Sequence, residues 1–177
     1  MASVTRASAE RPSRPAIPVL TAIVLSVLSL AGACAHYGFA GSLPAHLETI
    51  RIEPFRSRVQ EYGLEQELTS LVTERIVMDG RLAVVTGEQD SELEAVVAAW
   101  SRSPYSYTSS EQVEEYRLEI RVELTFADLV EESDILDAES VTAWIVYDPS
   151  AESEQDARRR LLQEMAEEIV RRCLSGW

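Results

Sequence analysis

Lysine is absent from this sequence of 177 residues, so all 16 of its basic residues are arginines. The 30 acidic residues outnumber them, and the formal net charge is −14. Binding to nucleic acid depends on a basic surface that neutralises phosphates, and adhesion to an anionic membrane by charge alone has the same requirement. The composition therefore argues against both interactions as the function of this chain.

Histidine and cysteine are scarce, with two residues of each type. A Ser-His-Asp triad would have to recruit His46 at the edge of the predicted domain, and no glycine-rich phosphate loop is present. The acidic segment 131–137 lacks the ligand spacing and the central glycine of a calcium loop. We therefore predict that the chain is not an enzyme and has neither a cofactor nor a metal site.

The amino-terminal segment has the layout of a bacterial lipoprotein signal peptide. Three arginines precede an apolar run from Ile17 to Leu30, and the small residues Ala31-Gly32-Ala33 stand directly before Cys34. This pattern predicts a signal peptide over residues 1–33 and lipid attachment at Cys34. Two alternatives are a signal anchor that stays in the membrane, although Pro18 interrupts its start, and an ordinary cleaved signal.

Lipidation of Cys34 would leave Cys173 as the one remaining thiol, which excludes a disulfide framework. Cys173 lies at helical spacing among apolar residues, so we expect it to be buried in the core. Ala35 follows the lipidated cysteine where an aspartate would favour retention in the inner membrane. The predicted location is therefore the outer membrane, with the chain held there by its lipid anchor.

Hydrophobic spacing predicts a short tether over residues 34–45 and a single α+β domain over residues 46–177. Apolar residues alternate most strictly from Tyr116 to Phe126, which indicates a long strand with one buried face. The expected strands are 46–55, 82–85, 93–100, 116–126 and 135–147, and the expected helices are 64–76 and 161–173. We predict a two-layer sandwich, with two helices packed on one face of a mixed four- to five-stranded sheet.

The hairpin between the third and fourth strands is the candidate contact site. A turn centred on Ser109-Ser110 would place Arg102 opposite Arg117 and Trp100 opposite Glu119. In that register Val96, Trp100 and Arg102 share the face away from the helices with Arg117 and Arg121. Facing arginines need either neighbouring glutamates or an anion or partner between them. The candidate contact residues are Trp100, Arg102, Tyr107, Ser109, Ser110, Arg117 and Arg121.

The order of short motifs along the mature chain resembles the lipopolysaccharide-assembly lipoprotein family, LptE. The matching positions are Cys34, Tyr37, Phe39, Gly41, Leu43-Pro44, Ile50, Ile52, Phe55, Gly63-Leu64-Glu65, Leu68-Thr69, Asp79-Gly80-Arg81-Leu82, Ser101-Arg102-Ser103-Pro104-Tyr105-Ser106-Tyr107, Glu115-Tyr116-Arg117 and Ile169-Val170-Arg171-Arg172. The resemblance implies two helices on a four-stranded sheet.

The resemblance also implies an outer-membrane lipoprotein that plugs the large β-barrel LptD, assists the assembly of that barrel and supports delivery of lipopolysaccharide to the cell surface. Family members contact lipopolysaccharide through basic residues near the hairpin tip, whereas residues 107–112 here contain none. Arg102 and Arg117 are therefore proposed as substitutes. An alternative is a lipoprotein adaptor of another envelope machine, such as a cell-wall synthase activator or a secretin pilot.

Overall fold

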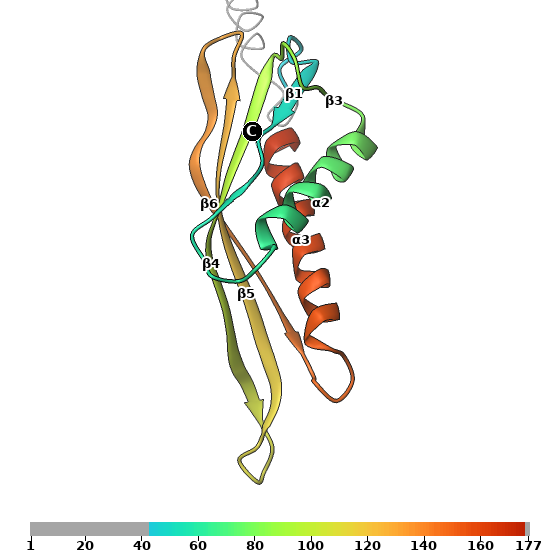
Figure 1. Ribbon diagram of the computed structural model, residues 1–177, viewed down its shortest axis with the longest axis vertical. Coiled ribbons are helices and arrows are strands. Elements are labelled where there is room, and N and C mark those ends of the chain that lie inside the picture. The colour runs from blue at the N-terminus through green and yellow to red at the C-terminus, as the bar shows by residue number, and fades with distance from the viewer. Residues whose placement is uncertain (1–42, 176–177) are drawn as a thin grey trace, which may run out of the picture. The chain divides into compact units, whose positions relative to one another are not determined.

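The computed structural model describes residues 43–175, which form six strands and two helices (Figure 1). Cys34, the predicted signal peptide and most of the predicted tether lie outside the described residues. In chain order the elements are β1 (Thr49–Ile52), β2 (Arg56–Ser57), α2 (Leu64–Asp79), β3 (Ala83–Val84), β4 (Ser91–Tyr107), β5 (Val113–Asp128), β6 (Ser133–Tyr147) and α3 (Glu154–Ser175).

The strands form one mixed sheet in the order β3-β1-β4-β5-β6, with β2 also paired to β4. The pairs β4–β5 and β5–β6 are antiparallel, whereas β1 and β2 run parallel to β4. Both helices lie on one face of the sheet (Figure 1). The predicted α+β sandwich is confirmed, and the sheet exceeds the expected strand number because the segment read as a turn after β1 contributes the two-residue β2.

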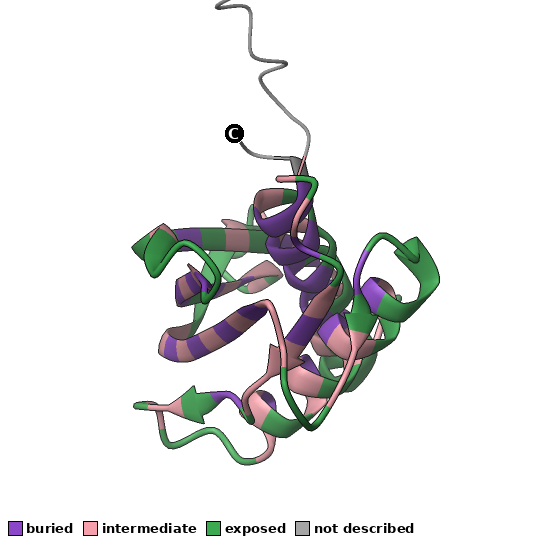
Figure 2. Cartoon of the chain, turned by 90° about the horizontal axis from the view of Figure 1, so that it is seen from above, coloured by how far each residue is buried: buried purple, intermediate pink, exposed green. Residues whose placement is uncertain are grey.

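The core lies between the sheet and the two helices. On β5 the side chains Leu118, Ile120, Val122, Leu124 and Phe126 are fully buried, as the strict alternation predicts. Figure 2 shows this alternation as bands of buried and intermediate residues. Cys173 of α3 joins the same core, and its burial raises the pKa of its thiol to about 12. That thiol is therefore neutral and unreactive at physiological pH.

Helix α2 ends where the sequence predicts. Gly80 has φ of 74°, a left-handed conformation that glycine adopts without steric cost, and its N–H donates to the Ile76 carbonyl at 3.1 Å. Four side chains at helical spacing, Leu64, Leu68, Val72 and Ile76, are fully buried against the sheet layer. Neither helix in the range 43–175 combines the length and the hydropathy that crossing a membrane requires.

The register of the β4–β5 hairpin differs from the prediction. Five residues, 108–112, join the two strands. The Thr108 N–H donates to the Gln112 carbonyl at 2.8 Å, which leaves a three-residue turn, 109–111, in which Glu111 adopts φ of 60°. The extra loop residue shifts the pairing by one, so Trp100 lies opposite Ile120 and Arg102 lies opposite Leu118.

Closer to the core, a bulge at Ala98 absorbs this shift, and the predicted register holds from Ser91 to Val97. A slip of one residue moves every side chain to the other face of a strand. Trp100 and Arg102 therefore lie on the face of the sheet that packs against the helices, the helix face. The prediction that they share the opposite face, the open face, with Arg117 and Arg121 is wrong. Val96, on the core side of the bulge, lies opposite Glu123 on the open face as predicted.

Candidate interaction surface

The tip of the β4–β5 hairpin is an exposed polar and aromatic turn. Tyr105 and Tyr107 are 54% and 59% exposed, and the loop Ser109-Ser110-Glu111 follows them. The Thr108 side chain holds the turn, since its hydroxyl lies 2.9 Å from that of Ser110 and accepts the Gln112 N–H at 3.2 Å. The tip therefore has a defined shape and carries no basic side chain.

Arg102 is held on the helix face by aromatic and acidic neighbours. Its guanidinium lies 3.6 Å from the ring centre of Tyr116, and its Nε donates to the Tyr147 hydroxyl at 2.8 Å. The Glu154 carboxylate, at the start of α3, lies 3.2 Å from the same nitrogen. These contacts join β4, β5, β6 and α3, so the guanidinium of Arg102 is already engaged within the domain.

Arg117 and Arg121 lie on the open face of β5, together with Trp144 of β6. The Arg117 guanidinium pairs with Glu119 at 2.6 Å and lies 4.5 Å from the Trp144 ring centre, while Trp144 is 49% exposed. Arg121 lies opposite Thr142, and its exposed side chain has no hydrogen bond or ion pair with any of the other residues described. This small platform combines an aromatic ring with one unengaged cation.

Nearer to β1, the same face carries ion pairs between strands. Arg51 pairs with Glu92 at 2.5 Å, Arg56 with Glu94 at 2.7 Å and Arg58 with Glu123 at 2.8 Å. Arg51 and Arg56 pair with glutamates of the neighbouring strand β4, whereas Arg58, directly after β2, reaches across β4 to Glu123 of β5. Each of these arginines is therefore neutralised locally. Together with Arg117–Glu119, these pairs favour the reading in which neighbouring glutamates satisfy the arginines of the sheet.

At the opposite end from the hairpin tip, His46 contacts the turn between β5 and β6. Its Nε2 donates to the Asp128 carboxylate at 2.5 Å, and Glu131 lies 3.9 Å from Nδ1. The hydrogen bond to Asp128 raises the pKa of His46 above its ordinary value. Burial opposes ionisation of Asp128, but the backbone N–H of Glu131, His46 and the N–H of Val130 outweigh it and lower the pKa of this carboxyl.

His46, Asp128 and Glu131 are also the one group within residues 43–175 whose donor atoms are close enough to hold a metal ion. Asp128 is already engaged, because it accepts the hydrogen bond from His46 and the backbone N–H groups of Val130 and Glu131. An ion pair that closes the end of the sheet accounts for this arrangement without a metal.

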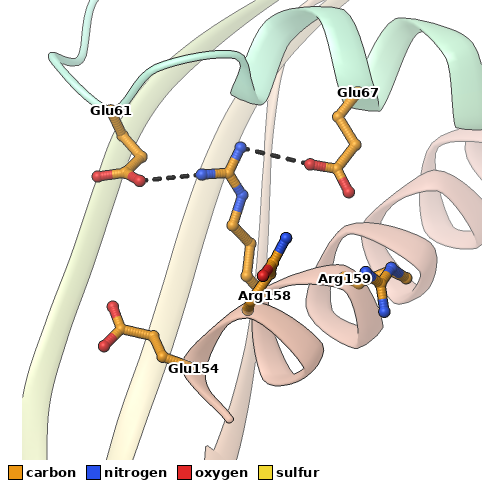
Figure 3. A pocket seen from close by; sticks show the side chains of 6 residues that line it. Glu61, Glu67, Glu154, Arg158 and Arg159 are labelled. Atoms are coloured by element: carbon orange, nitrogen blue, oxygen red, sulfur yellow. Dashed lines mark hydrogen bonds and ion pairs between the residues drawn. The ribbon is translucent and has the colours of Figure 1, made fainter.

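A cavity of about 430 Å³ opens between the start of α3 and the loop before α2 (Figure 3). Arg158 reaches across it, pairing with Glu61 at 2.9 Å and with Glu67 at 3.3 Å, and donates to the Tyr62 carbonyl at 3.1 Å. Glu154, Gln155 and Arg159 complete the lining, which includes no serine, cysteine or histidine. The ion pairs of Arg158 with Glu61 and Glu67 tie the loop to α3.

The seven candidate residues thus separate into three places. Tyr107, Ser109 and Ser110 lie at the tip, Arg117 and Arg121 on the open face, and Trp100 and Arg102 on the helix face. Sequence reasoning missed Trp144, whose neighbours Ala143 and Ile145 carry the apolar parity of β6. That parity is the signal that could have placed the tryptophan on the open face.

Solved structures with this fold come from several bacteria. An uncharacterized lipoprotein B from Nitrosomonas europaea is similar at 17% identity and a TM-score of 0.52, covering 76% of this chain and 86% of that protein. Protein XCC0632 from Xanthomonas campestris is similar at 11% identity and a TM-score of 0.53, covering 76% and 90%. At these identities the similarity establishes the fold alone. No curated protein matches the chain.

The family assignment comes from the sequence itself. Residues 47–173 match the family LptE, described as Lipopolysaccharide-assembly, and this range spans the sheet and nearly all of both helices. The motif order from the tether to α3 indicated the same family, and the α+β sandwich agrees with it. The chain therefore belongs to the LptE family of lipopolysaccharide assembly.

Proposed function

We propose that this protein is an outer-membrane lipoprotein, anchored through Cys34, that occupies the lumen of an LptD-type β-barrel. In that position it assists assembly of the barrel and supports delivery of lipopolysaccharide to the cell surface. It acts by binding and shaping its partner, without catalysis. Membership of the LptE family supports the assignment to lipopolysaccharide assembly.

The length of the β4–β5 hairpin is the observation that carries the proposal. β4 has 17 residues and β5 has 16, and their distal ends, with the loop that joins them, extend past the helices (Figure 1). At about 3.3 Å per residue, β4 spans roughly 55 Å. A bilayer with its headgroups is about 40–45 Å thick. An arm of this length, supported within a barrel, can reach from the periplasmic side to the outer surface.

The direction of the arm agrees with an anchor on the periplasmic side. β1 pairs with the first residues of β4, so the chain enters the domain at the end opposite the hairpin tip. Eight residues lie between Cys34 and Leu43, the first described residue, and a fully extended tether over these nine Cα-to-Cα steps reaches about 30 Å at most. The lipid therefore holds the β1 end near the inner leaflet, with the tip directed away from it.

The open face of the sheet is suited to the polar interior of a barrel. Four of its arginines, Arg51, Arg56, Arg58 and Arg117, are paired with glutamates, so the charge of this part of the face is locally balanced. Barrel lumens are lined by polar side chains. This part of the face can lie against a polar wall without burying an unpaired charge, and Arg121 is left to bind a separate anionic group.

We extend the proposal to lipopolysaccharide itself. Arg121 is an exposed cation of the open face that no other described residue pairs with, beside Trp144 and Arg117, while Tyr107, Ser109 and Ser110 offer aromatic and hydroxyl groups at the tip. Guanidinium groups bind phosphate through strong, charge-assisted hydrogen bonds. Arg121 would therefore take a phosphate of the glycolipid, and the tip would contact its sugars.

Co-purification tests the proposed function. The full chain, tagged at its C-terminus and extracted in mild detergent from its own bacterium, should recover an LptD-type barrel in stoichiometric amount. Recovery of a cell-wall synthase or a secretin in the absence of any barrel would refute the proposal and support the adaptor alternative.

A further inference from the structure

β6 is the long outer edge of the sheet. The order β3-β1-β4-β5-β6 leaves one side of β6 without a neighbouring strand among residues 43–175, whereas β3 at the other edge has only two residues. From Glu139 to Tyr147 the pairing of β6 with β5 is continuous. This stretch is long enough to pair with another strand.

The hydrogen bonds of the neighbouring strands show which backbone groups of β6 point outward. The Arg58 N–H donates to the Val97 carbonyl at 3.0 Å, so the polar groups of Val97 point toward β2. Val122, opposite Val97, therefore turns its own groups toward Val141 on β6. By alternation along β6, the backbone N–H and C=O groups that point away from β5 are those of Ser140, Thr142, Trp144 and Val146.

A contact from α3 agrees with this assignment. Arg160 Nη2 donates to the Val146 carbonyl at 3.3 Å, which caps the outer edge of β6 at its distal end. Within residues 43–175, no hydrogen bond to the outer backbone groups of Ser140, Thr142 or Trp144 is found. These three residues offer alternate N–H donors and C=O acceptors to an extended chain.

The side chains of this edge lack the usual protection against strand pairing. The eight residues from Ser140 to Tyr147 contain no charge and no proline, and most are β-branched, aromatic or aliphatic. Edge strands normally carry charges, prolines or bulges that block a further strand. The bulge of β6 lies outside this segment, at Ala138, where φ is 47°. The segment is therefore an unprotected edge to which another strand can be added.

The negative charges on both sides of this segment indicate which kind of chain can pair with it. Asp134 and Asp137 precede it and Asp148 follows it. If two copies paired antiparallel through β6, the aspartates of one copy would approach those of the other, which is unfavourable. A strand in the wall of a closed barrel has both edges paired and offers no free edge.

We propose that the outer edge of β6 binds an extended segment of the partner barrel protein that lies outside its closed wall, such as a lumenal loop or a periplasmic segment. That segment adds a strand beside Ser140–Trp144, with uncharged residues in register and basic residues at its ends. The inference rests on the proposed function, because it takes the barrel protein as the partner.

A proline substitution tests this pairing. Thr142→Pro removes an outward N–H and leaves the bonds between β6 and β5 in place, since proline is tolerated on an edge strand. Thr142→Val keeps the N–H and serves as the matched control. We expect recovery of the barrel with Thr142→Pro to fall by at least about tenfold relative to Thr142→Val.

Amide hydrogen exchange provides a second measurement on the unaltered chain, which stays informative if Thr142→Pro fails to fold. The amides of Ser140, Thr142 and Trp144 should exchange at least about tenfold more slowly in the barrel complex than in the free protein. Equal exchange in the two states, equal recovery by both variants, or capture of an untagged second copy through this edge would overturn the inference. If the unaltered chain recovers no barrel, the proposed function itself has failed.

Discussion

A cysteine at the hairpin tip, Ser109→Cys, measures how far the protein reaches across the envelope. Ser109 lies in the exposed loop 108–112 that joins the two long strands. The introduced thiol would be the one reactive thiol of the chain. Cys34 is expected to be lipidated, and Cys173 is fully buried with a pKa raised to about 12.

The expected result follows from the length of β4. Seventeen residues span roughly 55 Å, some 10 Å more than a bilayer with its headgroups. Under the proposed function the β1 end is held at the inner leaflet of the outer membrane, and the tip is then expected at the external surface. A thiol reagent too large to pass through the water-filled porins of the outer membrane, added to intact cells, should therefore label Ser109→Cys.

The matched control is a cysteine at the opposite end of the sheet. Val130 lies in the β5–β6 turn and is 56% exposed, so Val130→Cys is equally accessible in the free protein. In intact cells it should react only after the outer membrane is permeabilised. If Ser109→Cys and Val130→Cys both require permeabilisation, the domain lies wholly in the periplasm and the reasoning from length is refuted.

Three further outcomes are expected. Phe126→Ala should lower the free energy of unfolding in urea by about 3–5 kcal/mol, because the Phe126 side chain is fully buried, whereas Thr125→Ala on the open face should lower it by under about 0.5 kcal/mol. Equal losses of stability would contradict the assigned faces of β5. Asp128 raises the pKa of His46, so the stabilisation by this ion pair is fully present below the unfolded pKa of about 6.5 and is lost as the pH rises through the higher folded pKa. The melting temperature should therefore fall over this pH range, and His46→Gln should abolish the fall; a fall that persists in the variant would exclude the ion pair as its cause. Cys34→Ala should move the protein to the soluble periplasmic fraction, and retention of an uncleaved chain in the membrane would favour the signal anchor.

The core could be predicted from the sequence because it depends on spacing alone. The period of two from Tyr116 to Phe126 and the helical spacing of Leu64, Leu68 and Ile76 specify which faces are buried, whatever the details of the loops. Gly80 marked the end of α2 correctly, since a helix stop at glycine has a simple conformational cause.

The hairpin register could not be predicted in the same way. It depends on the positive φ of Glu111 and on the bulge at Ala98, and neither residue type signals such a conformation. One misplaced residue was enough to reverse the faces of Trp100 and Arg102. Arg117 and Arg121 were placed correctly because the alternation of β5 is independent of the loop.

The bulge at Ala98 also has an evolutionary consequence. It divides β4 into a segment committed to the core and a distal arm from Ala99 to Tyr107, whose pairing with β5 is set at the loop end. Inserting or deleting two residues in each strand of the arm would keep every side chain on its present face and change the reach by about 6–7 Å. If such changes fall beyond Arg102, they leave Trp100 and the contacts of Arg102 with α3 unaltered. Under the proposed function, related chains can therefore match the arm to outer membranes of different thickness without altering the core.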